Sequence, residues 1–365
     1  MEPFYAIKCN PNPQVVEYLS KLPGIGFDCA SQAELSLALN LDTPEDKIIY
    51  ANPCKGIKHL KFAKENGIKM MTFDNESELN KIKSIFPEAE LVIRIRVEEF
   101  GSVCSFKEKF GANLKDAEKL LQVAKTLNLN VIGVSFHVGS GCKNPDAFYY
   151  AIKNCRELFD FAKSELAFDF HFLDLGGGFT DLDKRATGEV SLFEKIANSI
   201  KEGIDEFFPA NTSNERLRII AEPGRYFAAK VFTLAVNVSS KKILSNDSQV
   251  ISTDEETQQV DKVMYYVNEG LYSAFNCVIF DHCDPEPSGV YTDGKLQVLD
   301  ASFEHVYKSV IWGPTCDGFD CISRELELPH LEVGDWVIFE NFGAYTMAAS
   351  SNFNGLPSAR IHWVN

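Results

Sequence analysis

A single lysine interrupts a short apolar and aromatic segment near the start of the chain. Residues 3–10 read PFYAIKCN, and runs of this kind predict a buried strand. A buried ammonium group is costly without a carboxylate partner and tends to lose its proton. Because a deprotonated lysine amine is the nucleophile that forms Schiff bases, Lys8 is a candidate catalytic residue. The alternative is a lysine at a strand edge whose amine reaches solvent.

Two glycine-containing segments could bind an anion. Gly176, Gly177 and Gly178 follow one apolar run, and Gly224 and Arg225 follow another. Glycines let backbone N–H groups approach phosphate oxygens, and Arg225 adds a cation. The two segments therefore predict a phosphate site, although a glycine run alone is more often a turn.

Apolar, β-rich runs alternate with amphipathic segments over the first part of the chain and must position these residues. The runs are residues 4–9, 25–30, 48–52, 70–74, 91–97, 131–136, 170–175 and 217–222, and the helical segments include 31–41, 60–66, 117–127, 148–164 and 192–207. Eight such alternations predict a (β/α)8 TIM-type barrel, an α/β fold with its chemistry at the carboxyl ends of the strands.

The predicted barrel gathers the candidate residues around one mouth. A lysine, a phosphate site and a carboxylate, here Glu222 at the end of the eighth run, are the three groups that hold pyridoxal phosphate. The alternative for Glu222 is a simple ion pair with Arg225. After the sixth run, His137 suits stacking on a flat ring and Ser140 suits a phosphate hydrogen bond, although a lone histidine is often structural. Further polar residues near the predicted mouth are Asp28 and Arg94.

The pattern changes near residue 232. The runs 232–238, 263–268, 295–299, 306–312, 335–340 and 361–364 follow one another with turns between them, which predicts an all-β sheet domain, sandwich-like or barrel-like. The polar, acidic stretch 245–261 is predicted to be an exposed loop within it. We therefore predict a cofactor-binding barrel over residues 1–231 and a C-terminal β domain over residues 232–365.

Composition excludes several classes of protein. The 365 residues are 45% hydrophobic and carry a formal net charge of -16, which favours a globular protein and argues against binding to nucleic acid or to an anionic membrane. No apolar run is long enough to span a membrane, and the first residues lack a signal-peptide pattern. The ten cysteines include no CxxC pair, so we expect reduced thiols in a cytoplasmic protein, any of which is free for catalysis.

Seven segments together resemble the eukaryotic ornithine decarboxylases, a family of fold-type III pyridoxal phosphate enzymes. They are residues 4–10, 26–31, 133–141, 176–179, 222–226, 312–318 and 340–345. The resemblance covers nearly the whole chain. It implies a carboxy-lyase that converts L-ornithine to putrescine, the first step of polyamine biosynthesis.

The resemblance also implies roles for individual residues. Lys8 would hold the cofactor, Glu222 would face its pyridine nitrogen and His137 would stack on its ring. The phosphate would be bound by Ser140, Gly176, Gly177, Gly178, Gly224, Arg225 and Tyr345. No metal is implied.

A homodimer with shared active sites is a further implication. The β domain of a second subunit would supply Cys316 as the acid at the substrate carbon, and the residues at the distal amine would be Asp317, Asp281 and Tyr272. A thiol can deliver a proton, and carboxylates suit an ammonium group, whereas Cys316 taken alone would more often be an inert thiol. Lys109 and Asp320 would form an ion pair across the interface.

Three features depart from the family pattern. Relatives carry several dozen residues before the lysine strand, which contribute to the β domain, and animal members carry a long C-terminal tail. We expect either a truncated form or a β domain that lacks part of its sheet. Phe280 stands where a tyrosine is common.

Several rival functions remain. Non-catalytic proteins of the antizyme-inhibitor type share this fold but have lost cofactor residues, which are present here. Alanine racemases need a tyrosine where this chain has Cys316, and diaminopimelate decarboxylases usually show a Cys-Glu-Ser-Gly-Asp loop, unlike residues 316–320. Lysine and arginine decarboxylases stay open as alternatives, and an antizyme-type regulator stays open as a partner.

Overall fold

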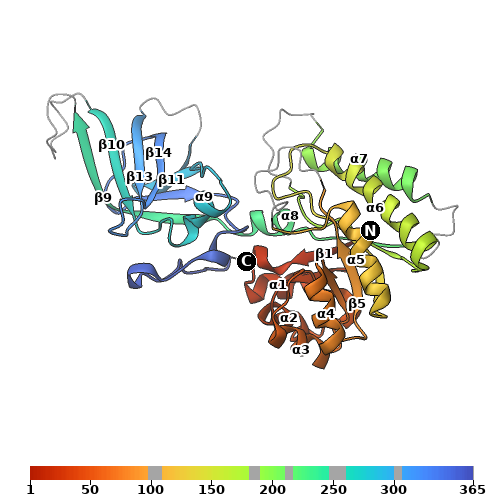
Figure 1. Ribbon diagram of the computed structural model, residues 1–365. Coiled ribbons are helices and arrows are strands. Elements are labelled where there is room, and N and C mark those ends of the chain that lie inside the picture. The colour runs from red at the N-terminus through yellow and green to blue at the C-terminus, as the bar shows by residue number, and fades with distance from the viewer. Residues whose placement is uncertain (98–108, 181–189, 210–216, 246–259, 300–305, 365) are drawn as a thin grey trace. The chain divides into compact units, whose positions relative to one another are not determined.

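The chain folds into two compact units. The structure is a computed structural model that describes residues 1–97, 109–180, 190–209, 217–245, 260–299 and 306–364. The units are Met1–Phe227, called the barrel unit below, and Ala228–Asn365, called the sheet unit (Figure 1). The predicted boundary at residues 231 and 232 lies slightly further along the chain. The predicted acidic loop, 245–261, falls almost entirely outside the described residues.

The barrel unit is a closed barrel of parallel strands, which confirms the predicted fold class. Within the described residues, each strand pairs with the next one along the chain, and the eighth pairs with the first. The strands are β1 (Glu2–Ala6), β2 (Gly26–Cys29), β3 (Ile48–Tyr50), β4 (Met70–Phe73), β5 (Glu90–Arg94), β6 (Asn130–Ser135), β7 (Phe172–Asp174) and β8 (Arg218–Ala221).

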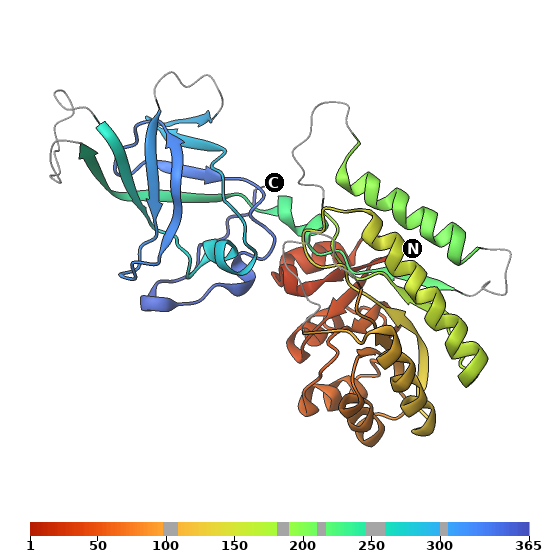
Figure 2. The same ribbon diagram turned by 45° about the horizontal axis from the view of Figure 1, so that its top comes forward.

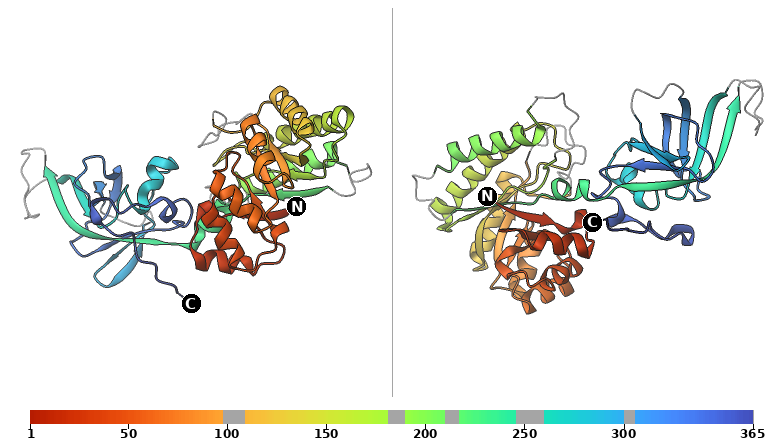
Figure 3. Two further views of the ribbon diagram at one scale, coloured as in Figure 1. Left: turned by 60° about the horizontal axis from the view of Figure 1, so that its bottom comes forward. Right: turned by 180° about the vertical axis from the view of Figure 1, so that it is seen from behind.

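Helices follow the strands and lie outside them (Figures 2 and 3). They are α1 (Pro13–Ser20), α2 (Gln32–Leu39), α3 (Ile57–Glu65), α4 (Glu76–Ile85), α5 (Leu114–Thr126), α6 (Asp146–Leu166), α7 (Leu192–Phe207) and the short α8 (Arg225–Ala228), with the 3-10 turns η1 (Ile7–Cys9) and η2 (Glu45–Lys47). Polar N-caps begin several of them: Ser191 caps α7 in a capping box with Glu194, which satisfies backbone N–H groups that have no partner within the helix.

A layer of apolar side chains fills the barrel. Phe4, Ile49, Met70, Val92, Ile132, Phe172 and Ile220 come from seven different strands and are all buried. Parallel strands are covered on both faces, so their sequences read as continuous apolar runs. The filled interior leaves the carboxyl ends of the strands as the place for a site.

An ion-pair cluster joins the first and last strands at the opposite end of the barrel. Arg218, which begins β8, donates from Nε and Nη2 to the two carboxylate oxygens of Glu2 in β1, each at 2.9 Å. Lys47 Nζ donates to Glu2 Oε2 at 2.6 Å. The hydrogen bonds from Arg218 and Lys47 lower the pKa of Glu2 to about 2, so the cluster stays charged at neutral pH and helps to close the barrel.

The sheet unit contains a seven-stranded sheet in its described part. Its order is β12-β11-β15-β9-β10-β13-β14, in which only β10 and β13 run parallel. The strands are β9 (Leu234–Ser245), β10 (Val260–Val267), β11 (Gly289–Thr292), β12 (Lys295–Val298), β13 (Tyr307–Trp312), β14 (Cys321–Leu328) and β15 (Trp336–Phe339). The predicted strand at 361–364 is wrong: these residues are exposed and form no strand. β11 and β14 had no predicted counterpart.

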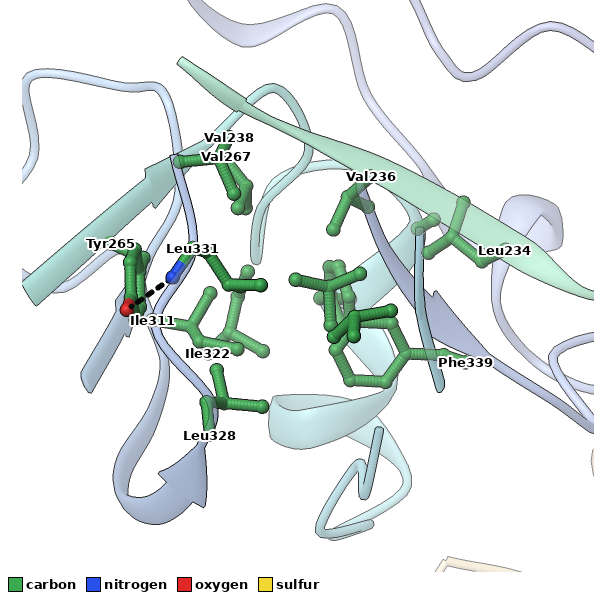
Figure 4. Packing of buried hydrophobic residues seen from close by; sticks show 14 of the residues in the cluster. Leu234, Val236, Val238, Tyr265, Val267, Ile311, Ile322, Leu328, Leu331 and Phe339 are labelled. Atoms are coloured by element: carbon green, nitrogen blue, oxygen red, sulfur yellow. Dashed lines mark hydrogen bonds between the residues drawn. The ribbon is translucent and has the colours of Figure 1, made fainter. Parts of the chain in front are cut away.

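The sheet curves around an apolar core. Side chains from β9, β10, β13, β14 and β15 point toward one another (Figure 4). Tyr265 is fully buried, and its hydroxyl accepts a hydrogen bond from Leu331 N at 3.1 Å and donates to Pro329 O at 3.4 Å. The buried hydroxyl of Tyr265 therefore has hydrogen-bond partners, which offset the free-energy cost of burying a polar group.

Short helical turns complete the sheet unit. They are η3 (Ala229–Val231), η4 (Ala274–Asn276), α9 (Cys277–Phe280), η5 (Met347–Ala349) and η6 (Phe353–Gly355). Across the residues that the structure describes, no helix has the length and apolar character needed to cross a membrane.

Candidate active site

Lys8 lies just beyond the end of β1, in the turn η1. The prediction that it belongs to the strand is wrong, because β1 ends at Ala6. The expectation of a buried amine is also wrong, since the side chain is 42% exposed. The turn keeps Ile7 and Cys9 buried and directs Lys8 outward. Its Nζ forms an ion pair with the carboxylate of Asp28 in β2, which is itself 1% exposed.

Asp174 ends β7 and Glu222 directly follows β8, and the charges of the two buried carboxyl groups act on each other. Burial raises the pKa of Asp174 to about 7, against the hydrogen bond that its Oδ1 accepts from Gly176 N at 2.9 Å. Burial and the charges of Asp174 and Asp28 raise the pKa of Glu222 well above its ordinary value. Within the described residues, Glu222 Oε1 is buried without a hydrogen-bond partner.

His137 follows β6 and is held by the neighbouring glycines. Gly139 N donates to its Nδ1 at 2.9 Å, so the ring proton belongs on Nε2. Burial and the positive charges of Arg94 and Lys8 lower the pKa of His137 well below its ordinary value. A Cβ on residue 177 would lie 2.8 Å from His137 Nε2, so only glycine fits there. His137 is therefore a neutral ring in a fixed place.

Ser140 and Arg225 come together from the loops after β6 and β8. Arg225 Nη2 donates to Ser140 Oγ at 3.3 Å. Gly224, just before α8, is buried. This arrangement brings together three of the residues predicted to bind phosphate. Arg94, at the end of β5, lies over the ring of Phe110 at 5.0 Å.

A buried aspartate in the sheet unit holds the loop that carries Cys316. Asp320 is 1% exposed; its Oδ2 accepts hydrogen bonds from Thr315 N at 3.0 Å and Thr315 Oγ1 at 2.7 Å, and its Oδ1 accepts one from Leu271 N at 2.7 Å. Cys316 itself is exposed, and its Sγ donates to Asn354 Oδ1 at 3.6 Å. The predicted ion pair of Asp320 with Lys109 of a second subunit stays a prediction.

Asp317 and Tyr272 are brought together beside Cys316. The Tyr272 hydroxyl donates to Asp317 Oδ2, and Phe319 N donates to Asp317 Oδ1 at 3.0 Å. The hydrogen bond from Tyr272 lowers the pKa of Asp317. The Tyr272 ring also stacks on Phe353, with centroids 4.3 Å apart. Asp317 is thus an ionised carboxylate in a fixed orientation.

Two other predicted residues lie on separate segments of the sheet unit. Asp281 directly follows α9, and Tyr345 lies in the loop after β15 with a φ of 55°. A non-glycine residue in the left-handed region is uncommon and costs free energy. The phosphate-binding role that the resemblance implies for Tyr345 stays a prediction.

Asp174 and Lys55 were missed by sequence reasoning. Asp174 stands directly before the glycine run and ends a predicted strand, which was the available signal. Lys55 follows β3 and is 2% exposed, with an ion pair to Glu78 Oε1 at 3.0 Å. Its segment has no apolar run to mark it as buried.

Together the fold and the mouth of the barrel unit define a class of protein. A parallel barrel that places a lysine, two buried carboxyl groups, a neutral imidazole and a serine hydrogen-bonded to an arginine at its strand ends is suited to hold a phosphorylated ring cofactor.

Comparison with known proteins makes the class specific. Residues 1–229 match the family described as pyridoxal-dependent decarboxylase, pyridoxal binding domain. An ornithine decarboxylase of Mus musculus is 46% identical over 362 residues, which are 99% of this chain and 75% of the relative. Antizyme inhibitor 2 of Xenopus laevis is 46% identical over 363 residues, 100% of this chain and 75% of that protein. The solved arginine decarboxylase of Paramecium bursaria Chlorella virus is 36% identical with a TM-score of 0.84, covering 98% of this chain and 87% of that one.

The chain belongs to the family of pyridoxal phosphate-dependent amino-acid decarboxylases. The residues at the mouth fit the cofactor. Glu222 Oε1 is a buried polar atom that lacks a partner in the described part of the chain, and a pyridine N–H would supply one. The neutral imidazole of His137, whose Nδ1 accepts from Gly139 N, suits contact with a flat ring.

Proposed function

We propose that the protein decarboxylates L-ornithine to putrescine. The observation that carries the proposal is the ionised Asp317, held by Tyr272 directly beside the Cys316 thiol. A carboxylate suits the distal ammonium of a basic amino acid, and a thiol suits proton delivery. The similarity to an ornithine decarboxylase over nearly the whole chain supports the same substrate.

The barrel unit supplies the residues that would hold the cofactor. Lys8 would bind it covalently, and the Asp28 carboxylate beside Lys8 Nζ is placed to accept the proton that the amine must lose. His137 would lie against the ring, while Ser140 and Arg225 would bind the phosphate. When bound, pyridoxal phosphate supplies an electron sink for the electron pair that the departing CO2 leaves behind.

Tyr345 and the glycines Gly176, Gly178 and Gly224 complete the proposed phosphate site. Gly178 has a φ of 111°, and a Cβ there would lie 2.8 Å from Val138 Cγ2. Backbone N–H groups freed of side chains can approach phosphate oxygens closely.

The sheet unit supplies the residues that would handle the substrate. Cys316 Sγ would deliver a proton to the α carbon after CO2 leaves, and the exposed thiol is free to reach a substrate. Asp317 and Asp281 would bind the distal ammonium. Asp320 would keep the loop in place, because its three hydrogen bonds hold Leu271 and Thr315.

A homodimer is part of the proposal. The barrel residues and the Cys316 loop belong to different units of the chain, and the family resemblance assigns the loop to the neighbour's barrel. In a two-fold dimer each site would then take Lys8 from one subunit and Cys316 from the other.

A non-catalytic binding protein is the second candidate. The antizyme inhibitor 2 of Xenopus laevis has the same identity to this chain as the mouse ornithine decarboxylase, so overall similarity does not separate the two. Lys8, His137, Glu222 and Cys316 are all present here, which favours an enzyme.

Product analysis tests the proposal. The purified protein, supplied with pyridoxal phosphate, should convert carboxyl-labelled ornithine into equal amounts of CO2 and putrescine. Lys8→Ala and Cys316→Ala should each lose nearly all of this activity, whereas Asp205→Asn, an exposed change in α7, should keep it. Failure of the wild-type protein to release CO2 from ornithine, lysine or arginine would favour the binding protein.

A further inference from the structure

A pair of buried carboxyl groups lies at the mouth of the barrel unit, and only one of its members has a role in the function proposed above. Glu222, 7% exposed, is expected to face the pyridine nitrogen, whereas Asp174, 1% exposed, has no assigned role. Buried carboxylates need a cation or a proton. The way in which the negative charge of this pair is neutralised therefore sets the protonation state of Glu222.

The main chain holds the two residues side by side. Gly176 N donates to Asp174 Oδ1 at 2.9 Å, and Gly176 O accepts from Glu222 N at 2.7 Å. Gly176 has a φ of 61°, and a Cβ there would lie 2.1 Å from Phe136 O. Gly176, which has little room to move, thus holds Asp174 through its N–H group and Glu222 through its carbonyl oxygen.

The surroundings of the two carboxyl groups favour a proton on one of them. Both groups are buried, and the charge of Asp174 raises the pKa of Glu222; two ionised carboxylates have only acceptor atoms, so a proton would let one group donate to the other. The buried Glu222 Oε1 has no hydrogen-bond partner in the part of the chain that the structure describes.

The charges around the pair lead to the same conclusion. The pair interacts with Asp28 from β2, Lys8 from η1 and Arg94 from β5. Three carboxyl groups therefore face two cations, and Glu34 adds a further carboxyl group beside Asp28 and Lys8. A proton held in common by Asp174 and Glu222 reduces this excess of negative charge, which is costly for buried groups. Burial also raises the pKa of both acids.

We propose that Asp174 is a positioning residue that shares one proton with Glu222 and thereby fixes the rotation and the protonation of the carboxyl group at the cofactor. The inference depends on the proposed function only in placing Glu222 at the pyridine nitrogen.

Infrared spectroscopy tests the shared proton in the full chain freed of cofactor. The wild-type protein should show the carbonyl band of a protonated carboxylic acid that persists to a higher pH than the band of an ordinary exposed carboxyl group. Asp174→Asn and Glu222→Gln should each remove this band, measured as the difference between the wild-type and variant spectra, because the acid that remains is ionised beside Lys8 and Arg94. The exposed Asp205→Asn should leave it unchanged. A band that survives in Asp174→Asn, or none in the wild type, would overturn the proposal.

Cofactor affinity tests the positioning role. The amide of Asp174→Asn can still hydrogen-bond to Glu222, whereas Asp174→Ala cannot. We expect the dissociation constant of pyridoxal phosphate to rise about tenfold in the alanine variant and clearly less in the asparagine variant. Wild-type affinity in Asp174→Ala would contradict the role. Neither measurement uses a substrate, so a failure here is distinct from a failure to decarboxylate ornithine.

Discussion

Two lysines of the barrel unit have environments opposite to those that the sequence indicates. Lys8, which stands in an apolar run, is 42% exposed and paired with Asp28. Lys55, in a polar loop, is 2% exposed. Its ammonium donates to two main-chain carbonyl oxygens and pairs with Glu78, and burial lowers its pKa to about 8. A lowered pKa alone would make Lys55 the better nucleophile, but its protons are all engaged, which indicates a structural role.

Chemical trapping separates the two lysines. Borohydride reduction of the protein with bound pyridoxal phosphate should fix the cofactor to the peptide that contains Lys8, as measured by mass spectrometry. The reason is that the Lys8 amine is accessible and has Asp28 beside it to take a proton. Lys8→Arg keeps the positive charge and should show no labelled peptide. Label on the Lys55 peptide would contradict the assignment.

Removal of the partner of Lys55 should destabilise the barrel in a pH-dependent way. Glu78→Gln leaves a buried ammonium unpaired, which costs about 3–5 kcal/mol. The pKa of Lys55 is already lowered to about 8 in the folded chain, and the Glu78 carboxylate raises it, so Glu78→Gln should lower the pKa of Lys55 further. Between the two pKa values the folded variant binds fewer protons than the folded wild type. The deficit of the variant, measured by urea unfolding, should therefore be largest where Lys55 is charged in both proteins and shrink as the pH rises to about 8.

The predicted stability loss of Glu78→Gln can be compared with that of a control variant in the same helix. Glu76→Gln changes an exposed residue in the first turn of the same helix and should have little effect at any pH. A deficit in Glu78→Gln that stays constant from mildly acidic pH up to the pKa of Lys55, about 8, would show that the charge of Lys55 is not its cause.

At the scale of elements, the barrel strands were predictable because burial on both faces makes each one an apolar run. The strand β14 was not, since the charged residues Arg324, Glu325 and Glu327 interrupt it at exposed positions. Residues 361–364 were wrongly predicted to form a strand because they are apolar. A strand also needs a neighbouring strand to pair with, and apolar composition does not supply one. The contact of Asp174 with Glu222 depends on the adjacency of β7 and β8, which residue types alone do not reveal.

The glycine run after β7 has a packing role beside the predicted phosphate role. Gly177→Ala would place a methyl group 2.8 Å from His137 Nε2 and 3.0 Å from Glu222 O, so the imidazole must move. We expect cofactor affinity to fall by about tenfold or more, since an overpacked site costs about 1–3 kcal/mol. The matched control is Gly56→Ala, whose nearest neighbour is a His59 carbon at 3.9 Å. Unchanged affinity in Gly177→Ala would show that the ring is not held by this contact.

At the scale of the whole molecule, the candidate residues divide between two units. The sequence could name both sets because their motifs are local, but it could not show how Asp320 and Tyr272 fix the Cys316 loop, since those contacts join distant segments. The proposed dimer would explain why the candidate residues are divided between the barrel unit and the sheet unit, because a site shared between subunits forms only when two chains associate.

Subunit mixing tests the shared site. Lys8→Ala and Cys316→Ala chains, each nearly inactive, should regain about one quarter of wild-type activity when mixed equally, because half of the dimers are hybrids and each hybrid holds one intact site of two. Activity should fade on dilution toward monomers. If mass measurements demonstrate hybrids and no activity returns, both residues serve the same chain.

The most direct measurement of the central claim is a competition between ornithine, lysine and arginine in one solution with the wild-type protein, in which the amine products are followed over time. The product ratios give the ratios of kcat/KM. We predict that putrescine dominates and that the product from lysine trails it by about 10-fold to 200-fold, because one additional methylene in a fitted pocket is worth about 1–3 kcal/mol. Equal rates for ornithine and lysine, or a preference for arginine, would contradict ornithine decarboxylation as the function of this protein.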